Sequence, residues 1–213
     1  MSQVLEQLLN ALVIGSFYAL VALGYSMVYG IIRLINFAHG DLYMLGAFFG
    51  YSALLLLGRL SFGGGVTGVL LAMLIAMALT GGLGVLVERV AYRPLRDAPR
   101  IIPLITALGM SLFLENAVMV FRPWGASFRV YPVTLGRAGF ELFGVHIGYA
   151  HLAIFAMALC LMVGLHLFVE RSTLGKAMRA VAFDREAAQL MGINANRMIS
   201  MGFFLGSIMA AAA

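Results

Sequence analysis

Two long runs without a charged residue constrain this chain most, residues 8–29 and 66–87. Each holds about the 20 residues that an α-helix needs to cross ~30 Å of hydrocarbon at a rise of 1.5 Å per residue. The chain as a whole is 62% hydrophobic and 11% charged, whereas soluble domains use roughly 45–50% apolar residues. A soluble core cannot hide this surplus. The sequence therefore predicts an integral membrane protein.

Four further apolar stretches extend the pattern, residues 42–57, 101–121, 151–169 and 198–213. The stretch 42–57 is short, so it either spans with the help of Phe37 and Ala38 or enters the membrane only partly, and we favour a span. The last stretch stops after 16 residues, and we expect the natural protein to continue beyond Ala213. The predicted fold class is all-α: one polytopic transmembrane domain over residues 1–213, with about six membrane helices and the last incomplete.

Basic residues in the loops predict the orientation of these spans. Ten fall on one side, which the positive-inside rule makes the cytoplasm, and four fall on the other. The N-terminus is then periplasmic, and residues 122–149 form a periplasmic loop whose alternating pieces, RVYPVTL and FELFGVHI, are typical of a small hairpin. The cytoplasmic set is Arg33, Arg89, Arg93, Arg96, Arg100, Arg171, Lys176, Arg179, Arg185 and Arg197, and the periplasmic set is Arg59, Arg122, Arg129 and Arg137.

Patterns of enzymes and of metal sites are missing from the sequence. The only Gly-Lys pair, at Gly175, has no phosphate-loop glycine before it and Ala177 after it, so we expect no ATP binding by this chain alone. There is no H-E-x-x-H, no cysteine cluster and no G-x-S-x-G elbow. We accordingly predict no catalytic residue, no metal and no cofactor. Gly81, Gly82 and Gly84 are interpreted as helix-packing residues, and the single cysteine, Cys160, as a packing residue.

Polar groups inside or beside apolar runs are the candidates for a translocation path, because a polar group without a partner in a membrane is costly. Asn36, His39 and Asp41 follow the first run and could bind a substrate, line a pathway or cap the next helix. Glu115 and Asn116 lie within the run 101–121. They face either a polar cavity or, for Glu115, the membrane surface near Arg122.

The longest polar excursion on the cytoplasmic side covers residues 170–198. Met178, Val181 and Ala182 recur there at helical spacing. A second short helix is predicted after them: Asp184 suits an N-cap, Glu186 suits the positive helix start, and Gly192 can take the left-handed conformation that ends a helix. Such a short rod outside the membrane is suited to contact a soluble partner.

Residues 186–192, Glu186-Ala187-Ala188 with Gly192 four positions later, match the EAA-loop pattern of ABC importer permeases. Residues 17–48, FYALVALGYSMVYGIIRLINFAHGDLYMLGAF, and residues 171–194 resemble the corresponding segments of branched-chain amino acid permeases of the LivH type. Two features depart from that family. The Pro-containing apolar tail that often follows the EAA glycine is replaced by residues 202–205, and family members continue into further helices.

The resemblance implies a permease subunit of the bacterial inner membrane that moves Leu, Ile or Val without reacting with it. Its implied partners are a second permease, two cytoplasmic ATPase subunits and a periplasmic substrate-binding protein, with no nucleic acid. The implied ATPase-coupling residues are Asp184, Arg185, Glu186, Ala187, Ala188 and Gly192. Two alternatives stay open: an ABC permease for urea or short amides, and an ion-coupled secondary transporter or channel.

Overall fold

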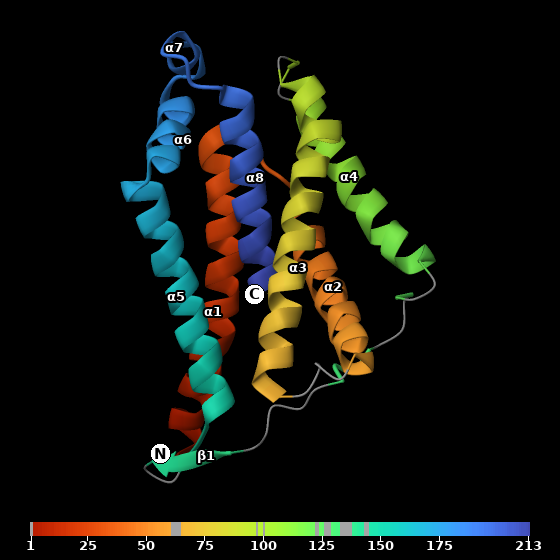
Figure 1. The fold of residues 1–213 in the computed structure, drawn as a ribbon, viewed down its shortest axis with the longest axis vertical. Helices are drawn as coiled ribbons and strands as arrows, with labels where there is room; N and C mark the ends of the chain where they lie inside the picture. The colour runs from red at the N-terminus through yellow and green to blue at the C-terminus, as the bar shows by residue number, and fades with distance from the viewer. Residues whose placement is uncertain are drawn as a thin grey trace.

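The computed structural model describes residues 2–60, 65–96, 98–99, 101–121, 124–125, 129–132, 138–142 and 145–213; the predicted loop residues Arg100, Arg122 and Arg137 lie outside this part. The chain forms a bundle of long helices (Figure 1). Five of them are long and apolar enough to cross a membrane, which confirms the predicted all-α polytopic bundle. They are α1 (Ser2–Ile32), α2 (His39–Arg59), α3 (Gly65–Val87), α4 (Ile101–Val120) and α5 (Tyr149–Arg171).

The core lies around the last helix, α8 (Ala195–Ala212), which packs against α1, α2 and α3 (Figure 1). Gly24 of α1 and Gly206 of α8 let these two helices touch backbone to backbone: a Cβ on Gly24 would lie 2.5 Å from the Gly206 carbonyl oxygen. On α3, a Cβ on Gly81 would lie 2.7 Å from the Phe204 ring. Glycines permit such approach because they carry no side chain. The packing prediction is confirmed for Gly81 and Gly84, whereas Gly82 faces open space.

Helix α2 is 21 residues long and begins at His39, with Ala38 as its N-cap. Helix α2 is long and apolar enough to cross a membrane, but the prediction that Phe37 extends the helix is wrong. The start of α2 lies beside the middle of α1, because His39 Nε2 is 3.2 Å from the Val21 carbonyl oxygen. Val21 precedes the end of α1 by about 16 Å of helical rise. Residues 33–38 therefore lead back into the bundle as non-helical chain, which a membrane tolerates where protein covers it.

The segment between α4 and α5 contains a two-stranded antiparallel hairpin, β1 (Gly139–Leu142) and β2 (Val145–Gly148), as predicted for FELFGVHI. Two aromatic side chains tie the same segment to α2. Tyr131 Oη donates a hydrogen bond to the Ala47 carbonyl at 2.6 Å, and Trp124 Nε1 donates to Ser52 Oγ at 2.9 Å. Trp124 also packs against Phe48, Phe49 and Phe121. These contacts hold the segment over the end of the bundle opposite α7.

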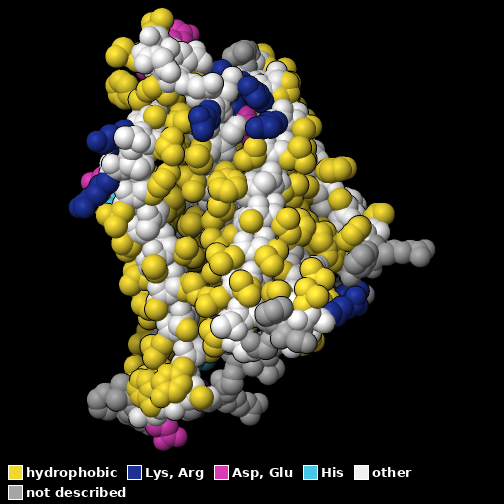
Figure 2. Space-filling model, viewed as in Figure 1, with side chains coloured by type: hydrophobic (Ala, Val, Ile, Leu, Met, Phe, Trp, Pro, Cys, Tyr) yellow, Lys and Arg dark blue, Asp and Glu magenta, His cyan; other side chains and the backbone are white. Residues whose placement is uncertain are grey.

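Helices α4 and α5 form the outer parts of the bundle and turn most of their apolar side chains outward. Only 6% of the most apolar window of α5 is buried inside the chain. Figure 2 shows hydrophobic side chains over much of the surface along the helices, with Lys and Arg gathered toward the end that carries α6 and α7. Cys160 lies on the exposed surface of α5. Its interpretation as a packing residue is therefore wrong within the described chain.

Candidate functional site: helices α6 and α7 and their contacts

Helix α6 (Thr173–Phe183) follows α5 directly and packs one face on the bundle. Ser172 caps it, because the Ser172 hydroxyl accepts a hydrogen bond from the Gly175 amide at 2.9 Å. Met178 and Val181 are buried, which confirms the predicted helical spacing. Arg179 donates to the carbonyls of Val169 and Glu170 at 3.0 and 3.2 Å and so covers the open end of α5. Helix α6 is thereby fixed to the membrane domain.

Helix α7 (Arg185–Leu190) is a six-residue rod with both ends defined by hydrogen bonds. Asp184 is its N-cap: the carboxylate accepts from the Ala187 amide at 3.0 Å. At the other end Gly192 has φ +82°, and the Ile193 amide donates to the Ala188 carbonyl at 3.0 Å. The Gly192 amide donates to the Gln189 carbonyl at 2.9 Å, which completes a Schellman motif. The predicted cap and stop are confirmed.

One side of α7 packs on the protein and the other is open. Ala188 is buried in the same apolar cluster as Met178 and Met198. Glu186 and Ala187 are exposed. Three large apolar side chains at the ends of α6 and α7 are also exposed, at 81–89% of their surface, and they are Phe183, Leu190 and Met191. An exposed apolar group around a rigid rod is typical of a surface that another protein covers.

A buried polar network joins the start of α8 to the end of α3. Beyond Val87, α3 continues as a π-helix, η1 (Glu88–Tyr92), and a short 3₁₀ turn, η2 (Arg93–Leu95). The Glu88 carboxylate is fully buried and pairs with Arg96, whose side chain is 5% exposed. Glu88 also accepts a hydrogen bond from the Ser200 hydroxyl at 2.6 Å. Arg96 donates to Asn196 Oδ1 at 2.6 Å, so both partners of the ion pair also hold α8.

Sequence reasoning missed this network. Glu88 was given no role in the sequence analysis, and Arg96 was counted only among the loop arginines that predict the orientation. In the structure the Arg96 side chain is buried against Glu88. The available signal was an acidic residue directly at a span end, followed by four arginines within twelve residues. Its pairing depends on the π-helix, which changes the direction of side chains and which no local pattern predicts.

At the break between α1 and α2, the polar residues mostly fix the chain. Asn36 and His39 are each 2% exposed. Asn36 Oδ1 accepts from the Tyr92 hydroxyl at 2.7 Å, and His39 Nε2 lies at the Val21 carbonyl. Within the described part of the chain, Asn36 Nδ2 and His39 Nδ1 have no hydrogen-bond partner. These contacts fit the loop-fixing interpretation.

The other polar candidates divide between two helices. Asp41 of α2 lies near Ser111 of α4 and close enough to Glu115 for electrostatic repulsion. Glu115 is exposed on α4, and Asn116 donates to the Leu112 carbonyl of its own helix at 2.7 Å. The structure thus brings Asp41 and Glu115 to one face between α2 and α4. Asn36 and His39 face α1 and η1 instead. The predicted approach of Glu115 to Arg122 falls outside the described residues.

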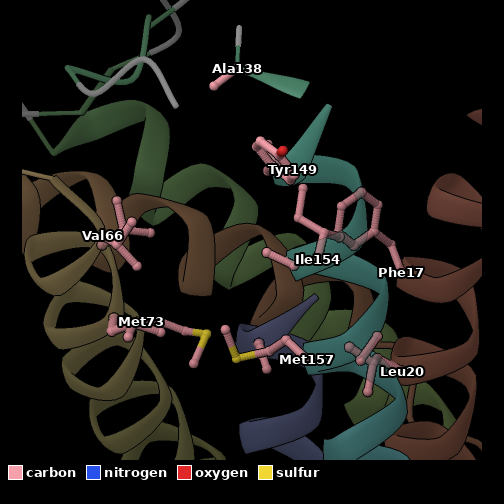
Figure 3. A pocket seen from close by; sticks show the side chains of 14 residues that line it. Phe17, Leu20, Val66, Met73, Ala138, Tyr149, Ile154 and Met157 are labelled. Atoms are coloured by element: carbon pink, nitrogen blue, oxygen red, sulfur yellow. The ribbon is translucent and has the colours of Figure 1, made fainter. Parts of the chain in front are cut away.

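An apolar cavity of about 380 Å³ lies between α1, α3 and α5. Figure 3 shows Met73 of α3 and Met157 of α5 pointing toward each other across it, with Phe17 and Leu20 of α1 at its side. None of the described residues that line it is charged. These residues therefore cannot neutralise the two charges of a free amino acid. Among the described residues, no group of three His, Cys, Asp or Glu could hold a metal ion.

Comparison with protein families gives one family model over nearly the whole chain. Residues 7–213 match the model described as "Branched-chain amino acid transport system / permease component". No solved structure matches the chain significantly.

Curated relatives agree with the family match. The chain is 46% identical over 217 residues to the high-affinity branched-chain amino acid transport system permease protein BraD of Pseudomonas aeruginosa. It is 38% identical over 215 residues to the corresponding protein LivH of Escherichia coli K12, and 37% identical over 213 residues to LivH of Salmonella typhimurium. Each alignment covers 98% of this chain and 68–69% of the relative.

Proposed function

The chain belongs to the family of branched-chain amino acid transport permeases, and from this we propose that it is the membrane-spanning permease subunit of an ABC importer for Leu, Ile and Val. Partner subunits hydrolyse the ATP, and the chain itself catalyses no reaction. A second permease, two cytoplasmic ATPases and a periplasmic binding protein complete the importer in the inner membrane. The observation that carries the proposal is α7, a rod capped at Asp184 and stopped at Gly192, with exposed apolar residues around it.

The contacts of α7 support a route by which closure of the ATPase is transmitted to the membrane helices. An ATPase closing against Glu186, Ala187 and the apolar residues beside them pushes α7 as one piece, because both its ends are fixed. Residues 191–194 lead from α7 into α8, whose N-cap Asn194 accepts from the Arg197 amide at 3.0 Å. Since α8 packs on α1, α2 and α3 and is joined to α3 through Glu88, a shift of α8 moves the centre of the bundle.

For the translocation path we propose the predicted set Asn36, His39, Asp41, Glu115 and Asn116. Carboxylates at membrane depth face a polar path or a protein partner rather than lipid. Asp41 and Glu115 meet between α2 and α4, on a face where a second permease would complete the path. A weak site suffices there, because the binding protein would select the substrate.

The proposed orientation places the N-terminus and residues 122–149 in the periplasm and residues 170–198 in the cytoplasm. Single cysteines at Arg93 and Trp124, in a chain whose Cys160 is changed to Ala, test it with an impermeant maleimide on whole cells. Trp124→Cys should react and Arg93→Cys should not. The opposite labelling would refute the orientation.

The function is tested by purifying the complete importer and reconstituting it in proteoliposomes with the binding protein. We expect ATP-dependent uptake of radiolabelled Leu that excess Ile and Val suppress and that urea and acetamide leave unchanged. Suppression by the amides alone would favour the alternative permease for urea or short amides. Uptake that needs an ion gradient and persists without the ATPase subunits would refute the ABC importer.

A further inference from the structure

A second cavity, of about 230 Å³, lies at the cytoplasmic end of the bundle. Three arginines line it, each from a different element: Arg33 after α1, Arg96 after η2, and Arg185 at the start of α7. The rest of the described lining is apolar and includes Ile32, Phe183 and Ile199. No acidic residue is among the lining residues that the structure describes. We propose that this cavity binds the phosphate group of an anionic phospholipid of the cytoplasmic leaflet.

The charges around the cavity favour an anion. Burial lowers the pKa of Arg96, Glu88 raises it, and the nearby Arg185 and Arg93 lower it again. The positive groups therefore repel one another, and Glu88 offsets only part of this, because its carboxylate lies on the side of η1 and α8. A phosphate oxygen inside the cavity would relieve the repulsion and accept charge-assisted hydrogen bonds.

Donors are also in place. Arg96 Nε is buried, and no hydrogen-bond partner for it is found among the described residues. Arg33 uses one nitrogen on the Ala182 carbonyl at 3.4 Å, and a guanidinium carries five N–H donors. Arg33 also has φ +53°, a conformation that non-glycine residues rarely adopt. The chain thus turns sharply after α1 at the very residue that lines the cavity.

The position of the cavity selects a lipid as the source of the phosphate. The end of α1 and the start of α8 bound it, so it lies where the bundle leaves the apolar layer. Its apolar wall, with Ile32 and Leu34, suits an acyl chain next to the headgroup. Basic pockets between membrane helices on the cytoplasmic side are known to take anionic headgroups. A bound headgroup would connect α7 to the ends of α1 and α3 beside the coupling network.

The test measures the melting temperature of the purified protein in mild detergent during titration with dioleoyl phosphatidylglycerol, dioleoyl phosphatidylcholine or inorganic phosphate. We expect a saturable rise with phosphatidylglycerol and little with the other two. Arg33→Asn, which suits positive φ, combined with Arg185→Gln should weaken phosphatidylglycerol binding by about tenfold or more. The control is Arg171→Gln, at the exposed end of α5 away from the cavity, which should bind as the parent does.

Three results would overturn the proposal. Equal effects of both lipids would make the binding a general effect of detergent exchange. A rise with inorganic phosphate alone would assign the cavity to a free anion. Unchanged phosphatidylglycerol binding in the double variant would assign the lipid to another site. If the double variant does not fold, Arg33→Asn alone is measured, because Arg33 is exposed.

Discussion

The two ion pairs of the described chain lie in contrasting regions. Glu88 and Arg96 pair inside the end of the bundle that carries α6 and α7, where their side chains are 0% and 5% exposed. His166 and Glu170 pair one turn apart on the outer helix α5, where the side chains are 71% and 57% exposed. The first pair joins α3 to α8 through Ser200 and Asn196. The second connects α5 only to itself.

The contrast extends to the helices that carry the pairs. Helix α8 contacts α1, α2, α3 and α6, while only 6% of the most apolar window of α5 is buried inside the chain. In a membrane, apolar surface gains little by leaving lipid, so close packing and polar contacts hold helices together. Substitutions around α8 should therefore disturb the whole bundle, and substitutions on α5 should remain local. Four predictions test this, from the largest expected effect to the smallest.

Glu88→Ala should have the largest effect. It leaves the Arg96 guanidinium buried without its counter-charge, which typically costs about 3–5 kcal/mol in the free energy of unfolding. The measurement is denaturant unfolding in detergent micelles. The control is Glu88→Gln combined with Arg96→Met, which removes both charges and should be clearly more stable than Glu88→Ala alone. Glu88→Gln and Arg96→Met are also measured singly. If the double variant lost as much unfolding free energy as the two single variants added together, the idea of a coupled buried pair would be contradicted.

Gly24→Ala should come next. The added Cβ would lie 2.5 Å from the Gly206 carbonyl oxygen, so α1 and α8 must separate. Overpacking of this kind lowers the free energy of unfolding by about 1–3 kcal/mol. Gly30→Ala is the matched control on the same helix, because nothing lies within 4 Å of its added Cβ. The unfolding free energy of this control should equal that of the parent or exceed it by up to about 1 kcal/mol, because Ala has a higher helix propensity than Gly. If both variants lost the same unfolding free energy, the close contact between α1 and α8 would not be the cause of the loss.

Gly192→Val should act on transport more than on folding. A branched side chain at φ +82° costs roughly 1–2 kcal/mol, and the cost falls on the end of α7. We expect Leu uptake and ATPase association to fall together in reconstituted importers while the membrane bundle stays folded. Gly192→Asn is the control, because Asn tolerates the left-handed conformation, and Glu186→Ala should lower uptake less. Normal assembly and uptake of Gly192→Val would refute the docking role of α7.

Much of the fold was accessible from the sequence, because spans depend on local apolar length. The caps of α7 were accessible too, since Asp184 and Gly192 act on neighbouring backbone groups. The Gly24–Gly206 contact was not, because the chain has 25 glycines and only the arrangement of helices decides which of them touch.

The polar network and the arginine cavity were hidden for a related reason. Ser200 lies 112 residues from Glu88 in sequence, and Arg33, Arg96 and Arg185 come from three separate loops or turns. The positive-inside rule counts these three arginines alike, because it considers only their charge and their loop. Their burial differs, however, since Arg33 is exposed and Arg96 is not. Long-range pairing of this kind requires the arrangement of the helices.

The smallest effect is expected for Glu170→Gln. This change breaks the ion pair between Glu170 and His166 on α5, where both side chains are largely exposed. Exposed pairs contribute about 0–1 kcal/mol, because the surroundings screen the charges and two mobile side chains must be ordered. We expect the unfolding free energy of Glu170→Gln to match that of the parent within about 0.5 kcal/mol, with any difference shrinking as salt is added. The measurement is the same micelle titration as for Glu88→Ala, at low and at high salt. A salt-independent loss comparable to that of Glu88→Ala would mean that the His166 face of α5 is covered in the folded protein, and that the division between a tightly packed α8 and an outer α5 is wrong.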